Sequence, residues 1–238
     1  EWISLAGTAV WDGLDAPTRR RLALTELCAF FSLTLHGERP LVSGLANRMY
    51  DGRHDGTTSR YLHHFLEEES RHIAMFGAFC LRYHRVYPWK KLTLGPGDDD
   101  VRFYVKGLVV EEIGLHYNAV FAADERLPPI VRQINALHRR DELRHVAFGR
   151  AALAERVAAS PPEVLPEIRR WTATYLRQSL GDLCNAEALA DAGVPDPHEA
   201  RAAALGSPAF RARCREASVG LVALLCATGL LATDPFTG

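Results

Sequence analysis

The sequence predicts an all-α protein, and three observations support this prediction. Ala, Leu, Arg and Glu dominate the chain of 238 residues, and long stretches carry apolar residues at three- and four-residue spacing. The strict alternation of apolar and polar residues that marks a half-buried strand is missing. Clusters of Pro, Gly and Asp divide the chain into segments of helical length. We therefore expect a bundle of four long core helices with additional C-terminal helices.

The four core helices are expected at residues 17–50, 57–83, 98–124 and 128–159. The first should end in the turn-forming segment 51–56, and Thr57 to Ser59 supply an N-cap for the second. The Pro- and Gly-rich segment 87–100 indicates a crossover loop, whose last residues, Asp98 to Asp100, cap the third helix. Pro128 and Pro129 begin the fourth helix.

A helical cover is expected to follow the core. Three prolines between residues 161 and 166 end the fourth core helix, and a fifth helix should run to about residue 190. A loop at 193–197 precedes shorter helices at about 198–205 and 207–231. We expect residues 1–238 to form a single domain, with the core bundle at about 17–159 and the cover at about 160–238.

Composition excludes several classes of function. The net charge is −1, from 28 Lys and Arg against 29 Asp and Glu, so no broad basic surface for nucleic acid is expected. No apolar run reaches the roughly 18 residues of a membrane span. The first residues lack the basic start and apolar stretch of a secretory signal. Five dispersed cysteines without a C-x-x-C pair indicate reduced thiols, and together these features predict a cytoplasmic protein.

A short repeat carries the chemistry. Residues 68–72 are Glu-Glu-Ser-Arg-His, and residues 141–145 are Asp-Glu-Leu-Arg-His. Because residues three apart share one face of a helix, the second acidic residue and the histidine of each motif point the same way. Two such pairs that converge from two helices can bind transition metal ions in a bundle core. The metal-ligand candidates from this repeat are Glu69, His72, Glu142 and His145.

Two further carboxylates have matching positions. Glu38 precedes Glu69 by 31 residues, and Glu111 precedes Glu142 by the same 31 residues. If the first two helices are antiparallel, Glu38 lies level with the motif, whereas Glu26 would lie about 18 Å away at ~1.5 Å per residue and is rejected as a ligand. The matched spacing and an apolar helix face favour Glu111, with its neighbour at position 112 as the alternative.

His138 stands one turn before Glu142 and two turns before His145, on the same face. It could therefore give one metal ion an additional nitrogen ligand. The equivalent position before the other motif is Phe65, so the predicted site is asymmetric. The alternative interpretation is a core histidine satisfied by a neighbouring carboxylate.

The cost of burying four carboxylates favours a metal site. Acids inside an apolar core are strongly destabilising unless cations neutralise them, so the pattern predicts two metal ions. Glu68 and Asp141 directly precede the ligand glutamates and could accept the free N–H of a ligand histidine across the bundle. The alternative is that both acids are solvated. Arg71 and Arg144 repeat with the motif, and either pair with these acids or lie on the surface.

These motifs resemble the AurF-type arylamine N-oxygenases among the ferritin-like di-metal carboxylate proteins. The resemblance depends above all on His-x-x-x-Glu-x-x-His at 138–145, with Glu-x-x-His at 69–72 and the glutamates at 38 and 111. It implies a ferritin-like four-helix bundle with two iron ions, manganese being the alternative metal.

The activity that the resemblance implies is the O2-dependent N-oxygenation of an aryl amine or related amino compound in biosynthesis, with a reductase or other external electron donor. Hydroxylation of C–H bonds or desaturation of a small molecule is the alternative reaction at such a site. Iron storage or di-metal sensing is less favoured, because an extra histidine at position 138 would hinder release of the ions. A homodimer is the expected assembly.

Overall fold

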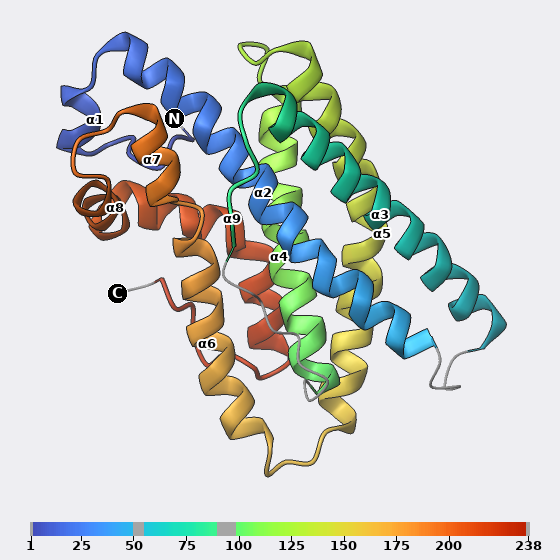
Figure 1. Cartoon of the computed structure of the whole chain (residues 1–238). Helices are drawn as coiled ribbons and strands as arrows, with labels where there is room; N and C mark the ends of the chain where they lie inside the picture. Colours follow the sequence, from blue (N-terminus) through green and yellow to red (C-terminus); the bar gives the residue numbers. More distant parts are fainter. Residues whose placement is uncertain (1, 50–54, 90–98, 237–238) are drawn as a thin grey trace.

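The computed structural model describes residues 2–49, 55–89 and 99–236. These residues form helices and no β-strand (Figure 1), so the predicted all-α class is confirmed for this part of the chain. The helices are α1 (Ala9–Gly13), α2 (Ala16–Met49), α3 (Gly56–Tyr83), α4 (Asp100–Ala123), α5 (Pro129–Ala159), α6 (Leu165–Gly181), α7 (Ala186–Ala192), α8 (Pro197–Gly206) and α9 (Pro208–Ala227).

Helices α2 to α5 form the core bundle. Helix α2 packs against α3 and α4, and α5 packs against α4 and α3. The C-terminal helices lie on one side of this bundle, where α6 and α9 contact α4 and α7 contacts α2 (Figure 1). The predicted ferritin-like four-helix bundle with additional C-terminal helices is therefore confirmed, and its cover lies over α2 and α4.

Close packing of α2 on α4 depends on small residues. A Cβ atom added to Gly44 of α2 would overlap the Phe103 ring of α4. A Cβ atom on Gly37 would lie 2.8 Å from a methyl carbon of Val110, also on α4. Both glycines let the two helices approach closely, and Gly37 does so next to Glu38.

Several predicted boundaries need correction. Helix α3 is capped by Asp55, whose Oδ1 accepts a hydrogen bond from the Thr58 amide at 2.7 Å, so it begins slightly before the expected cap. The single helix expected up to residue 190 is divided into α6 and α7. Asn185 begins the second of these helices, because its Oδ1 accepts hydrogen bonds from the amides of Glu187 and Ala188.

Other boundaries are close to expectation. Helix α9 ends at Ala227, earlier than expected, and is followed by Gly229 with φ of 71°. The predicted loop after α7 begins with Gly193, which has φ of 85°. Most of the predicted turn at 51–56 and most of the predicted crossover loop at 87–100 lie outside the described residues, as does Asp98 of the predicted cap. Asp99, which is described, caps α4.

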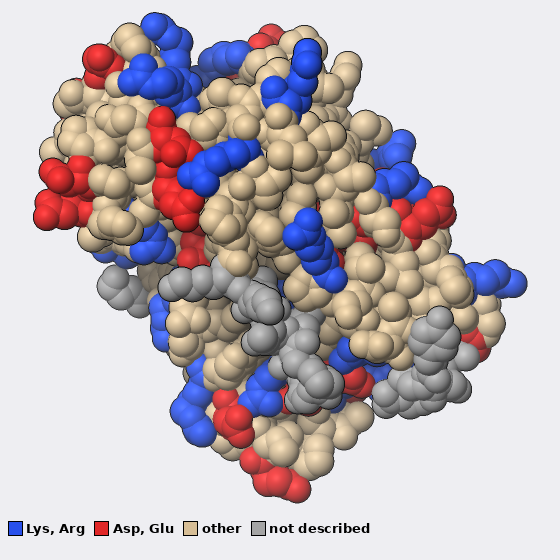
Figure 2. All heavy atoms as spheres, in the orientation of Figure 1, with Lys and Arg blue, Asp and Glu red and all other residues tan. Residues whose placement is uncertain are grey.

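The surface carries charges of both signs. Figure 2 shows Lys and Arg side chains interspersed with Asp and Glu over the described residues of this face. In the described part of the chain, no helix combines the length and apolar character that a membrane crossing requires.

Candidate metal centre

Seven candidate ligands from four helices converge in the core of the bundle. At most 4% of each residue is exposed to solvent. The structure therefore brings together every residue that the sequence predicted as a metal ligand. These residues are Glu38 on α2, Glu69 and His72 on α3, Glu111 on α4, and His138, Glu142 and His145 on α5.

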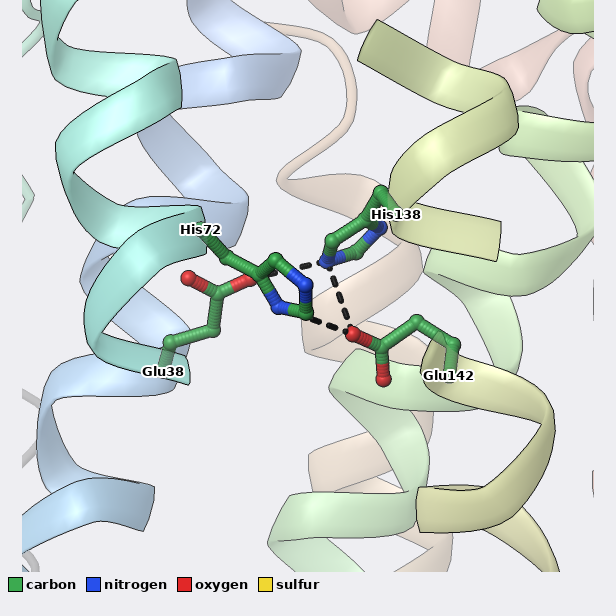
Figure 3. Close-up of side chains that lie close together, drawn as sticks. All are labelled: Glu38, His72, His138 and Glu142. Carbon is green, nitrogen blue, oxygen red and sulfur yellow. Dashed lines mark hydrogen bonds and ion pairs between the residues drawn. The ribbon is translucent and has the colours of Figure 1, made fainter. Parts of the chain in front are cut away.

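The first group contains Glu38, His72, His138 and Glu142, which point toward a common centre (Figure 3). One ligand atom from each residue lies within 4.8 Å of the others. Nε2 of His138 is 3.0 Å from Oε1 of Glu38 and 2.9 Å from Oε1 of Glu142. Nδ1 of His72 is 3.2 Å from the same Glu142 oxygen. The group thus offers two nitrogens and two carboxylates to one position.

The second group contains Glu69, Glu111, Glu142 and His145, again with ligand atoms within 4.8 Å of one another. Nδ1 of His145 is 2.8 Å from Oε1 of Glu69, 3.2 Å from Oε2 of Glu142 and 3.9 Å from Oε2 of Glu111. Glu142 belongs to both groups and directs one oxygen toward each. A carboxylate in this position can bridge two ions.

The unsatisfied atoms of the cluster test whether cations fit. Several of its oxygen atoms are buried without a hydrogen-bond partner among the described residues. They are Glu38 Oε2, Glu69 Oε2 and Glu111 Oε1. A buried polar atom without a partner costs about 1–3 kcal/mol. Two cations would satisfy these atoms together, and carboxylate oxygen with imidazole nitrogen suits iron and manganese.

Electrostatics in the cluster also favour cations. Burial raises the pKa of Glu38 well above its ordinary value, and the neighbouring carboxylates of Glu69 and Glu142 raise it further. Burial opposes protonation of His72, but hydrogen bonds to Glu142 and Glu69 dominate and raise its pKa to about 9. Without cations, protons therefore take up part of the negative charge, and metal ions would have to displace them.

His138 behaves differently from the other two histidines. Burial holds its pKa well below the ordinary value, and the nearby His72 and His145 imidazoles lower it further. By contrast, Glu142 and Glu69 raise the pKa of His145 to about 10 against the effect of burial. This direction favours the neutral imidazole, which is the form that a nitrogen ligand must have.

The outer nitrogens of two histidines meet acids from the opposite helix. Nε2 of His72 on α3 lies 3.4 Å from Oδ2 of Asp141 on α5. Nε2 of His145 on α5 lies 3.0 Å from Oε2 of Glu68 on α3. Both acids are buried, so the alternative that they are solvated is wrong. Such contacts fix the orientation of a ligand histidine and increase its basicity.

The arginines of the two motifs differ. Nη2 of Arg144 lies 2.5 Å from Oε1 of Glu68 and 3.0 Å from Oδ1 of Asp141, so it neutralises both acids. Arg71 approaches Glu68 only to 3.8 Å and pairs with the exposed Glu67 at 3.0 Å. Arg144 thus stabilises the buried acids, whereas Arg71 lies mainly on the surface.

The competing glutamates have other partners. Glu112 accepts two hydrogen bonds from the Arg150 guanidinium, at 2.8 and 2.5 Å, and lies outside both groups. Glu26 accepts a hydrogen bond from the backbone amide of Ser4 at 2.9 Å. The structure therefore places Glu111, and neither of these two, among the convergent candidate ligands.

Sequence reasoning missed Asn118. This residue lies on α4, is fully buried, and its side-chain amide contacts Nδ1 of His138. Asn118 follows Glu111 by two helical turns and so shares its face, which is a signal that the spacing contained.

A cavity of about 600 Å³ adjoins the cluster. At its inner end lie Gly37, next to Glu38, and Gly114, where an added Cβ would be 3.9 Å from Cε1 of His138. Its inner walls are apolar and come from α2 and α4, namely Phe30, Leu33, Val109, Val110 and Ile113. Its outer wall is more polar and includes Gln178, Ser179, Asn185, His198 and Arg201 from the C-terminal cover. The volume is within the range of about 300–1,000 Å³ that is common for ligand sites.

Comparison with known proteins agrees with this arrangement. A family model described as p-aminobenzoate N-oxygenase AurF matches residues 1–229, which include all seven convergent residues and the cavity walls. A search of curated proteins finds no match. The family match confirms the resemblance that the motifs indicated.

Proposed function

Because the chain belongs to the p-aminobenzoate N-oxygenase AurF family, we propose that it is an O2-dependent di-iron enzyme that N-oxygenates an aryl amine or a related amino compound. The family is one of oxygenases, so the chain is an oxidoreductase. The observation that carries the proposal is the pair of buried ligand groups that share Glu142.

The two groups define the proposed ligand sets. One iron would be held by Glu38, His72, His138 and Glu142, and the other by Glu69, Glu111, Glu142 and His145. Manganese is the alternative metal, because the same ligands suit it. The bound ions would supply O2 activation, with electrons from a reductase or another external donor. The protein fixes the number and geometry of the ligands and keeps the site dry.

We place the substrate in the cavity beside the first group. Its apolar walls suit an aromatic ring, while the polar outer wall can hydrogen bond to a substituent. An amine at the inner end would lie near Gly37 and Gly114, and the absence of a side chain at Gly114 leaves room beside His138. This placement brings the nitrogen of the substrate close to the proposed first ion.

The alternative functions would use the same cluster of carboxylates and histidines. C–H hydroxylation or desaturation would need only a different substrate in the cavity, since pocket shape selects the reaction. Iron storage fits less well, because a cavity with a polar outer wall adjoins the cluster and a third histidine faces the first group. We further propose that the chain is a single-domain, cytoplasmic protein that acts as a homodimer.

Metal analysis and product formation test the proposal. The purified protein should bind two iron ions per chain and, with O2 and a chemical reductant, convert members of an aryl-amine panel to N-oxygenated products identified by mass. Leu33→Trp should fill the cavity, keep both ions and lower kcat/KM. Leu24→Trp, at an exposed leucine of the same helix, is the control. Oxygen consumption without any N-oxygenated product would contradict the proposed reaction.

A further inference from the structure

We propose that Asn118 is the positioning residue for His138. Its side-chain amide can hydrogen bond to Nδ1 of His138 in both neutral tautomers of the ring, the one expected without a metal ion and the one expected with it. The inference rests on the proposed metal site. Asn118 lies on α4 and His138 on α5, so the contact crosses between two core helices.

The His138 ring joins Asn118 to the cluster. Nδ1 is in contact with the Asn118 amide, while Nε2 faces Oε1 of Glu38 at 3.0 Å and Oε1 of Glu142 at 2.9 Å (Figure 3). Asn118 is fully buried and His138 is 2% exposed. Water cannot readily replace the amide here, so Asn118 controls which ring nitrogen carries the proton.

In the structure the amide nitrogen of Asn118 faces Nδ1 of His138. In this state Nδ2–H donates to the Nδ1 lone pair, which leaves the ring proton on Nε2, where it can be donated to Glu38. This is the arrangement expected when no cation occupies the first group, because the carboxylates then need a donor.

A metal ion on Nε2 requires the opposite tautomer. The ring proton must then lie on Nδ1 and needs an acceptor. Oδ1 of Asn118 is buried and has no hydrogen-bond partner among the described residues. A half-turn of the amide exchanges its oxygen and nitrogen, so that Oδ1 accepts from Nδ1–H and Nδ2 takes the place that Oδ1 held.

On the side of Gly114 there is room for this turn. Gly114 lies one turn before Asn118, and even an added Cβ there would be 4.0 Å from Nδ2 of Asn118 and 3.9 Å from Cε1 of His138. No side chain at position 114 therefore fixes the amide in one orientation.

The other two cluster histidines have different outer partners. His72 and His145 face the carboxylates of Asp141 and Glu68, and a carboxylate can only accept, so it favours the proton on the outer nitrogen at all times. An amide can donate or accept. His138 should therefore be the weakest of the three histidines as a nitrogen ligand to a metal ion. It should also be the one whose tautomer changes when metal binds.

The test uses the metal-free full chain titrated with Co2+ against a competing chelator. Asn118→Leu removes both functions of the amide and should weaken binding of one of the two ions about 10–100-fold. Asn118→Asp retains an acceptor and should restore or tighten that binding. The control is Asn135→Leu, because Asn135 is equally buried but donates to the Val131 carbonyl of its own helix at 2.8 Å.

A second readout reports the tautomer directly. In the wild-type chain with 15N-labelled histidine, NMR should find the His138 ring proton on Nε2 without metal and on Nδ1 with Zn2+. An unchanged tautomer would overturn the proposal, as would equal losses of Co2+ affinity in Asn118→Leu and Asn135→Leu. Failure of the wild-type chain to bind Co2+ would instead contradict the proposed metal centre.

Discussion

Nε2 of His145 lies 3.0 Å from Oε2 of Glu68, which links a cluster histidine of α5 to a carboxylate of α3. The contact has a counterpart between His72 of α3 and Asp141 of α5, at 3.4 Å. The acid that precedes each candidate ligand glutamate therefore contacts the histidine of the other motif. The repeat in the sequence thus becomes a reciprocal contact in the bundle.

Glu68→Gln should weaken metal binding at the second group. The amide is neutral, so it cannot support the basicity of His145 as a carboxylate does, and we expect a loss of about 10–100-fold in affinity. Competition with a chelator measures it. Glu67→Gln, at the exposed neighbouring position, is the matched control. Equal affinities in the two variants would show that the contact does not support the ligand.

His138→Ala should fold normally but hold one ion weakly. The side chain supplies a nitrogen to the first group only, so the ion at the second group should remain. Metal analysis after dialysis and turnover with an aryl amine check this result. His63→Ala, at an exposed histidine of α3, should behave as wild type. Unchanged metal content and turnover in His138→Ala would remove this residue from the ligand set.

Metal uptake should release protons. In the metal-free protein the pKa is about 9 for His72 and about 10 for His145, both raised by the neighbouring carboxylates. Near neutral pH both imidazoles are protonated, and each must lose a proton to bind an ion. The apparent affinity should therefore rise with pH until these pKa values are passed. Titration of the weakly buffered protein with Co2+ and a pH indicator measures the release, and pH-independent affinity would contradict this account.

Gly44→Ala should destabilise the protein by about 1–3 kcal/mol, because the new methyl group overlaps the Phe103 ring and overpacks the core. Denaturant unfolding of the metal-free protein measures the change. Gly206→Ala is the control, since an added Cβ there meets no atom within 4 Å. Its effect should stay within about 0.5 kcal/mol. Equal free energies of unfolding for Gly44→Ala and Gly206→Ala would mean that α2 and α4 can move apart without loss of stability.

Helical periodicity and spacing predicted the convergence of the seven residues. Glu38 could be chosen over Glu26 because two residues that are equally far from the turn between antiparallel helices lie level with each other along the bundle. The partner of Glu112 could not be predicted in this way. Arg150 lies 38 residues further along the chain, and only packing shows that it turns Glu112 away from the cluster.

The Asn118 contact, the start of α7 and the cavity depend on tertiary contacts and on side-chain hydrogen bonds to the backbone. Asn118 shares a helix face with Glu111, but only the packing of α4 on α5 shows that its amide contacts His138. The start of α7 as a separate helix depends on a side-chain cap at Asn185, which local periodicity does not reveal. The cavity forms only where the C-terminal cover packs onto α2 and α4, and no segment encodes that contact by itself.

The central claim is that Glu142 binds two ions at once, and the iron content of its alanine variant tests this most directly. After reconstitution with Fe2+ and removal of excess metal, the wild type and Glu155→Ala, an exposed control on the same helix, should each hold two irons per chain. Glu142→Ala should hold fewer than one, since both groups lose a ligand. Two tightly held irons in Glu142→Ala, or none in the wild type, would contradict the account.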